Sequence, residues 1–262
     1  MKSLLERSRI LYSVLQKINK DSDYLEELAI NLSGIFECDI AILGTNGTIV
    51  AESKYRQDPI ICTDSMSLLQ AYAENPVQYH KNFLAVNETL CNLSIKEVAT
   101  MLFDQDYPNE SKEVWSVIPV YSGIERLATL ILCRYIRLFT DDEIVLTEYG
   151  ALVVMHEVLK IRRDILESDA KERAAVRSAL NSLSFSEREA LECIFSQLHG
   201  MEGNLVASKI ADEIGITRSV IVSALRKLES ASIIQSKSLG MKGTYIKVLN
   251  GFLFNELNSY PK

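Results

Sequence analysis

Residues 206–250 read VASKIADEIGITRSVIVSALRKLESASIIQSKSLGMKGTYIKVLN, and this stretch decides the fold of the C-terminal part of the chain. Its apolar residues recur at helical spacing as far as Ile214, and Gly215 follows where a short helix would end. Thr217 is expected to cap a second helix, because a threonine side chain accepts hydrogen bonds from the free backbone donors of a helix start. Two short helices joined by a glycine turn have the spacing of a helix-turn-helix unit.

The second helix of this unit is predicted to have an apolar face and an outward face. The inward residues are Ile221, Ala224, Leu225 and Leu228, and the outward stripe is Arg218, Ser219, Val222, Ser223 and Arg226. Arginine donates a forked pair of hydrogen bonds to guanine or phosphate, serine hydroxyls bond to either, and valine can meet a thymine methyl group. The stripe is typical of a helix that reads the major groove of DNA.

A basic β-hairpin is predicted after the second helix. Strands 233–238 and 244–248 bracket the tip LGMKG, which carries Lys242 near Lys237. We interpret this hairpin as a wing that contacts phosphate or the minor groove. The predicted DNA contacts are Ala207, Ser208, Thr217, Arg218, Ser219, Val222, Ser223, Arg226, Lys237 and Lys242.

The distribution of charge supports a surface for nucleic acid. The chain of 262 residues has a net charge of −7, which would disfavour nucleic acid if it were spread evenly. Residues 204–250, however, contain seven Lys and Arg against three Asp and Glu, a charge of +4, so the remainder carries −11. A basic patch on an acidic chain indicates one dedicated surface for phosphate.

The composition is that of an ordinary globular protein. The residues are 47% hydrophobic and 24% charged, with five prolines, which excludes a mainly disordered chain. No apolar run approaches the roughly 20 residues of a membrane-spanning helix. The charged start MKSLLERSRI lacks the pattern of a secretory signal. We therefore expect a cytoplasmic protein with no membrane partner and with its five cysteines reduced.

The N-terminal part alternates helices and strands. Two amphipathic helices are expected before Ile35, and an antiparallel sheet is expected from strands 40–43, 48–51, 115–121 and 126–135. The first two strands flank Asn46-Gly47, a dipeptide that favours a tight hairpin turn. A long helix begins at the sequence FTDD, residues 139–142, and is dense in charge beyond Lys160, as in a solvated connecting helix.

Several motifs resemble one known family. VASKIAD, GITRSVIV, ALRKLESA and SLGMKGTYIKVLN are nearly word for word those of the CodY family of pleiotropic transcriptional repressors, and SLSFSE, EYGALVV and ERLATLIL are similar to it more loosely. The resemblance implies an α+β architecture. A GAF ligand-sensing domain of helices around an antiparallel sheet would occupy residues 1–158, a linker helix 159–183, and a winged helix-turn-helix DNA-binding domain 184–262.

The same resemblance implies a function for the whole chain. Members of the family are homodimers that bind an AT-rich palindromic operator in double-stranded DNA. They act mainly as global repressors of genes for amino-acid metabolism and stationary-phase adaptation. Their GAF pocket binds isoleucine, leucine or valine as corepressor, and many also respond to GTP. No other cofactor is implied.

The effector pocket matches the family less well than the DNA-binding part does. Ser65 stands where the family has an arginine that grips the ligand carboxylate, and a serine alone does not balance a buried carboxylate. Three explanations stay open: Arg56 or Lys54 takes over, the alignment slips, or the effector has changed or been lost. The residues expected to line the pocket are Ala41, Leu43, Ser65, Met66, Leu69, Pro76, Thr100 and Leu102.

Glycines of the family are also replaced at two places in the chain. The family turn GGGERLG reads SGIERLA at residues 122–128, and Ser232 stands in place of the glycine usual after the recognition helix. A serine there costs roughly 1 kcal/mol if the position keeps a left-handed backbone.

Other kinds of site have little support in the sequence. No G-x-x-x-x-G-K-[ST] motif is present, so GTP binding rests on the resemblance alone. His80, His156 and His199 are far apart and lack metal-ligand spacing. The enzymatic alternative is a GAF-type redox enzyme, similar to methionine sulfoxide reductases, with an accessory winged domain. It requires two of four cysteines to meet in one pocket: Cys38, Cys62, Cys91 and Cys133.

Overall fold

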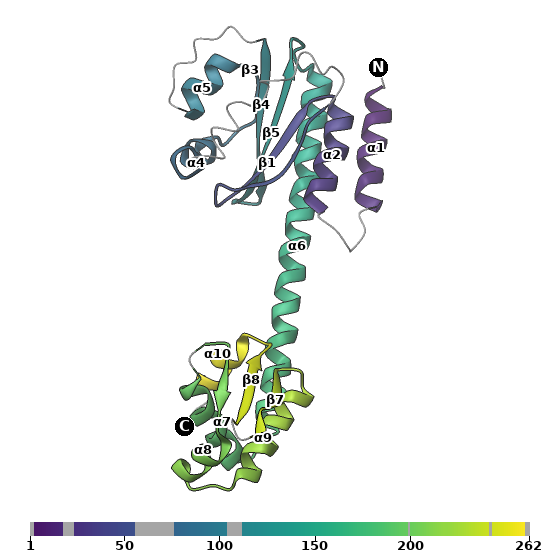
Figure 1. Cartoon of the computed structure of the whole chain (residues 1–262). Coiled ribbons are helices and arrows are strands. Elements are labelled where there is room, and N and C mark those ends of the chain that lie inside the picture. The colour runs from purple at the N-terminus through teal and green to yellow at the C-terminus, as the bar shows by residue number, and fades with distance from the viewer. Residues whose placement is uncertain are drawn as a thin grey trace. The chain divides into compact units, whose positions relative to one another are not determined.

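The computed structural model describes residues 3–17, 24–55, 76–103, 112–198, 200–240 and 243–259. The chain divides into two compact units, Met1–Ile161 and Arg162–Lys262. One long helix, α6 (Asp141–Asn181), has residues in both units (Figure 1). None of the helices within the described ranges is both long and apolar enough to span a membrane.

The N-terminal unit is built on an antiparallel sheet of five strands in the order β2-β1-β5-β4-β3. Its strands are β1 (Asp39–Gly44), β2 (Ile49–Ser53), β3 (Leu90–Ser94), β4 (Glu113–Ser122) and β5 (Glu125–Tyr135). The hairpin predicted around Asn46-Gly47 is confirmed, because β1 pairs with β2 and Gly47 has a φ of 84°. The predicted pairing of β4 with β5 is also present, and β3 extends the sheet at a position that the sequence did not indicate.

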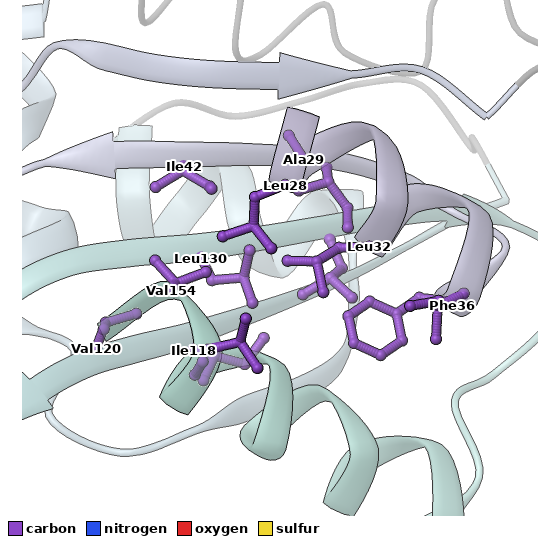
Figure 2. Close-up of a cluster of buried hydrophobic side chains, with 14 of the residues drawn as sticks. Leu28, Ala29, Leu32, Phe36, Ile42, Ile118, Val120, Leu130 and Val154 are labelled. Carbon is purple, nitrogen blue, oxygen red and sulfur yellow. The ribbon is translucent and has the colours of Figure 1, made fainter. Parts of the chain in front are cut away.

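Helices cover both faces of this sheet (Figure 1). On one face lie α1 (Leu4–Lys17), α2 (Tyr24–Phe36) and the first part of α6, and on the other lie α4 (Pro76–Ala85) and α5 (Ile95–Phe103). Residues alternate along β1, so that Ile40 and Ile42 are buried towards α2 and α6, while Ala41 and Leu43 are buried towards α4 and α5. Figure 2 shows the first of these clusters, where Leu28, Leu32 and Phe36 of α2 pack over the sheet.

The start of α6 is fixed by a buried group of charges. Thr140 and Glu143 form the predicted cap: the Thr140 N–H donates to the Glu143 carboxylate at 3.1 Å, and the Glu143 N–H donates to Thr140 Oγ1 at 3.4 Å. The same carboxylate pairs with Arg7 at 3.1 Å, Arg134 at 2.8 Å and Arg137 at 2.8 Å. Burial raises the pKa of Glu143, but hydrogen bonds from Arg134 and the Thr140 backbone and the nearby arginine charges outweigh it and lower that pKa to about 2.

The C-terminal unit contains the remainder of α6 and a small α/β assembly. Its elements are α7 (Phe185–Gln197), β6 (Glu202–Leu205), α8 (Ala207–Ile214), α9 (Arg218–Ser230), β7 (Ile234–Ser238), β8 (Thr244–Val248) and α10 (Phe252–Asn258). The three strands form an antiparallel sheet in the order β6-β8-β7. The predicted helix pair and hairpin are confirmed, whereas α7, β6 and α10 were not predicted.

Candidate nucleic-acid interface and effector domain

The turn between α8 and α9 has the conformation expected of a helix-turn-helix unit. Gly215 lies in the left-handed region with φ 72° and ψ 28°, and its N–H donates to the carbonyl of Ala211. Ile210 and Ala211 are buried beneath this turn. The chain can reverse here because glycine adopts a positive φ at little steric cost.

Helix α9 presents the two faces that its sequence predicted. Ile221, Ala224 and Leu228 have no exposed surface, and Leu225 is also buried. Arg218, Ser219 and Arg226 are exposed on the other side, and Val222 is half-buried beside them. The apolar face therefore fixes the helix to its unit and leaves these outward residues available to a partner.

The prediction that the Thr217 side chain caps α9 is wrong. Thr217 stands at the N-cap position, but its side chain makes no capping hydrogen bond. Its hydroxyl instead lies 2.7 Å from the hydroxyl of Ser219. The two hydroxyls form an exposed pair at the start of the helix, next to Arg218.

Ser223 is bonded within the protein. Its hydroxyl donates to Glu187 Oε1 at 2.7 Å, and Lys227 Nζ donates to Glu187 Oε2 at 2.7 Å. Glu187 is 6% exposed and closes a capping box at the start of α7 with Ser184. We call these four residues the Glu187 cluster: Ser184, Glu187, Ser223 and Lys227. The cluster ties α9 to α7. The Ser223 hydroxyl therefore helps to hold α9 in place.

Glu187 keeps its negative charge inside this cluster. Burial raises the pKa of its carboxyl, but hydrogen bonds from Lys227, the Ser184 backbone and Ser223 outweigh it and lower that pKa to about 2. The sequence reasoning missed this residue. The S-F-S-E pattern at residues 184–187 is a capping-box signal that could have placed Glu187 at a helix start, but nothing local indicates its partners in α9.

The remaining predicted DNA contacts lie in α8 and in the wing, and they differ in exposure. The Ala207 side chain is buried in the core of the unit, which rules out the side-chain contact expected of it, whereas Ser208 is exposed. Lys237 is exposed on β7, and Lys242 lies outside the described residues. Gly243 follows the tip of the wing, where a Cβ atom would collide with the carbonyl oxygen of Leu205, so only glycine fits.

The predicted effector residues are only partly brought together. Ala41, Leu43 and Leu102 are buried in one cluster between the sheet and the helices α4 and α5. Thr100 is exposed on α5 and does not belong to that cluster, and Pro76 begins α4. Ser65, Met66 and Leu69 lie outside the described residues, as does Arg56, while Lys54 is exposed.

Cys38 and Cys133 do not share the pocket that the redox alternative requires. Cys38 belongs to the cluster on the α2 face of the sheet and Cys133 to the cluster on the α5 face. Burial raises the pKa of the Cys38 and Cys91 thiols, the opposite of what a reactive thiolate needs. Cys62 lies outside the described residues. Among the residues described, no three His, Cys, Asp or Glu side chains gather as metal ligands.

Comparison with known proteins agrees with this architecture. The family model for the CodY GAF-like domain matches residues 3–182, and that for the CodY helix-turn-helix domain matches residues 201–261. The global transcriptional regulator CodY of Lysinibacillus sphaericus is 43% identical over 260 residues, which cover 97% of each chain. That of Bacillus velezensis is 42% identical over 262 residues, with 98% of each chain covered.

A solved structure, the cofactor-binding GAF domain of the nutrient sensor CodY from Clostridium difficile, is 26% identical with a TM-score of 0.41 and covers 60% of this chain and 99% of that one. The two family matches and the full-length relatives, together with the helix-turn-helix geometry, show that the chain belongs to the CodY family.

Proposed function

We propose that the chain is a DNA-binding global transcriptional regulator, mainly a repressor, that senses nutrient status through a small metabolite. The observation that carries this proposal is the outward stripe of α9, where Arg218, Ser219 and Arg226 stand exposed on a helix whose other face is buried. The full-length relatives, named as global transcriptional regulators, support it. Such a regulator acts on DNA in the cytoplasm.

The division of labour along the chain is part of the proposal. Residues 1–158 would sense the metabolite, residues 159–183 of α6 would link, and residues 184–262 would bind an AT-rich palindromic operator. Base reading is assigned to Arg218, Ser219, Val222 and Arg226, while Ser208, Lys237 and Lys242 would contact phosphates. Ser223 is given a positioning role, because its hydroxyl is held by Glu187.

The proposed effector is isoleucine, leucine or valine, with GTP as a second signal taken over from the family. Support comes from the apolar cluster of Ala41, Leu43 and Leu102, since a branched aliphatic side chain needs such a surface. Calorimetry with each of the three amino acids tests it, and a heat of binding from at least one is expected. Three flat titrations would show that this chain has diverged from the family and that its effector has changed or been lost.

A homodimer is proposed from the exposed face of α6. Val145, Tyr149, Leu152, His156 and Leu159 follow one another at alternating spacings of four and three, and Val145 and Leu152 are 62% and 53% exposed. All of them except His156 are apolar or aromatic, and residues of that kind at this period form the seam along which two helices pair. A second copy of the chain would cover them, and a twofold protein matches a palindromic operator.

Selection of bound duplexes from a random DNA library tests the proposed function as a whole. The full-length protein is expected to enrich an AT-rich inverted repeat, and the enrichment should depend on salt, because phosphate contacts release counterions. A library that leaves the selection with no preferred sequence would contradict the proposal. The GAF-type redox enzyme is not favoured, because Cys38 and Cys133 lie on opposite faces of the sheet.

A further inference from the structure

A groove of about 1030 Å³ runs along α9 within the C-terminal unit. One wall is the outward side of α9 from Arg218 to Ser230. The other wall is formed by Ala175, Ser178, Ala179 and Ser182 in the last turns of α6. The stripe proposed to read DNA therefore stands opposite a second helix across an open groove.

The lining of the groove has the chemistry of a phosphate-binding surface. Its charged residues are all basic, namely Arg218, Arg226 and Lys227, in a chain whose net charge is −7. The remaining lining residues are serines, alanines and one valine, with no aromatic side chain. Sites for small molecules are lined mainly by apolar and aromatic side chains, whereas arginines and hydroxyls are the usual partners of DNA phosphates.

The α6 wall is small enough to let a DNA strand come close. Three of its residues are exposed and have short side chains: Ala175, Ser178 and Ser182. An alanine side chain ends at Cβ and a serine side chain one atom later, at Oγ. Lys227 is held by Glu187, yet its side chain remains 39% exposed towards the groove that it lines. A polyanion seated against Arg218 and Arg226 would meet this wall without displacing any bulky group.

We infer that one sugar-phosphate strand of the bound duplex lies in this groove, against the last turns of α6. The inference rests on the proposed function and adds a contact surface to it. The helix that begins in the N-terminal unit at Asp141 then ends in the DNA interface itself. A change in the direction of α6 would alter the surface offered to DNA directly, because α6 itself forms part of that surface.

Two neighbouring alanines of α6 provide the test. Both Ala174 and Ala175 are exposed, but only Ala175 lines the groove. In full-length protein, Ala175→Asp should weaken binding to a labelled AT-rich palindromic duplex about tenfold, because a carboxylate would face a phosphate at short range. Ala174→Asp, with the same change in charge and helix propensity, should alter the affinity less than about twofold. Ala175→Lys should tighten binding and steepen its salt dependence.

Each other outcome is informative. Equal affinities for Ala174→Asp and Ala175→Asp would overturn the inference. So would an Ala175→Asp variant that binds DNA normally but changes its oligomeric state in sedimentation, which would assign the groove to a second copy of the chain. Wild-type protein that fails to bind any duplex would refute the proposed function instead, and so the two failures are distinguishable.

Discussion

The carboxylate of Glu187 lies 2.7 Å from Nζ of Lys227 and joins α7 to α9 across 40 residues of sequence. The same carboxylate accepts the hydroxyl hydrogen of Ser223, one helical turn earlier on α9. Both partners belong to the helix that carries the outward stripe. The angle at which Arg218 and Arg226 are presented therefore depends on a buried acid.

Replacement of Glu187 by Gln should loosen this attachment. We expect the free energy of unfolding of the C-terminal unit to fall by about 1–3 kcal/mol, because the hydrogen bonds from Lys227, Ser223 and the Ser184 backbone lose their charged acceptor. Far-UV circular dichroism in urea measures the loss. Trp115 is the one tryptophan of the sequence and lies in the N-terminal unit, so its fluorescence transition should not move. Glu189→Gln, an exposed position of α7, is the matched control and should leave both transitions unchanged.

The N-terminal unit should lose stability as the pH falls from about 4.5 to about 2. The folded-state pKa of Glu143 is lowered to about 2 from an ordinary 4.5, so the unfolded chain takes up a proton before the folded chain does. The stabilising contribution is complete above pH 4.5 and is lost through this window. Urea titrations followed by Trp115 fluorescence at several pH values should show the decline.

A Glu143→Gln variant separates this carboxylate from the other acids. It should cost about 3–5 kcal/mol at neutral pH, because buried Arg134 loses its carboxylate partner and buried Arg7 keeps only its pair with Glu37. It should also flatten the decline between pH 4.5 and 2. The exposed Glu148 of the same helix serves as the control, and Glu148→Gln should keep the wild-type stability and slope. An unchanged slope in Glu143→Gln would assign the acid sensitivity to other groups.

Ser232→Gly should stabilise the C-terminal unit. Ser232 has a φ of 57°, in the left-handed region, and glycine adopts that region without the steric penalty of a side chain. The expected gain is about 1 kcal/mol in the unfolding free energy measured by circular dichroism. Ser230→Gly, at the helical end of α9, should do the reverse by about 0.5–1 kcal/mol. A Ser232→Gly variant that loses stability would show that the hydroxyl makes a compensating contact.

The exposed seam of α6 should control the oligomeric state. Leu152→Glu places a charge in the middle of the proposed helix pair and should convert the dimer to a monomer in sedimentation velocity. Ile124→Glu offers a control, because Ile124 is fully exposed in the turn between β4 and β5 and is not one of the seam residues. Dimers of equal affinity in both variants would place the contact elsewhere.

The C-terminal unit could be predicted because its signals are local. Gly215 and the period of apolar residues in α9 each act within a few residues of sequence. Strand β6 was not predicted because its four residues, EGNL, show no apolar alternation. It is held in place by its pairing with β8. Arg7 was noted only as part of the charged start of the sequence, yet it is 4% exposed and pairs with Glu143, 136 residues away. Contacts at that separation leave no local pattern.

The most direct test of the account compares Arg218→Glu with Lys171→Glu in binding to the AT-rich palindromic duplex. Both residues are exposed and both substitutions change the charge by the same amount, but Lys171 does not line the groove. Fluorescence anisotropy should show about 100-fold weaker binding for Arg218→Glu with unchanged thermal stability, and Lys171→Glu should stay close to wild type. An Arg218→Glu variant that binds the duplex with wild-type affinity and sequence preference would contradict the assignment of α9 to DNA.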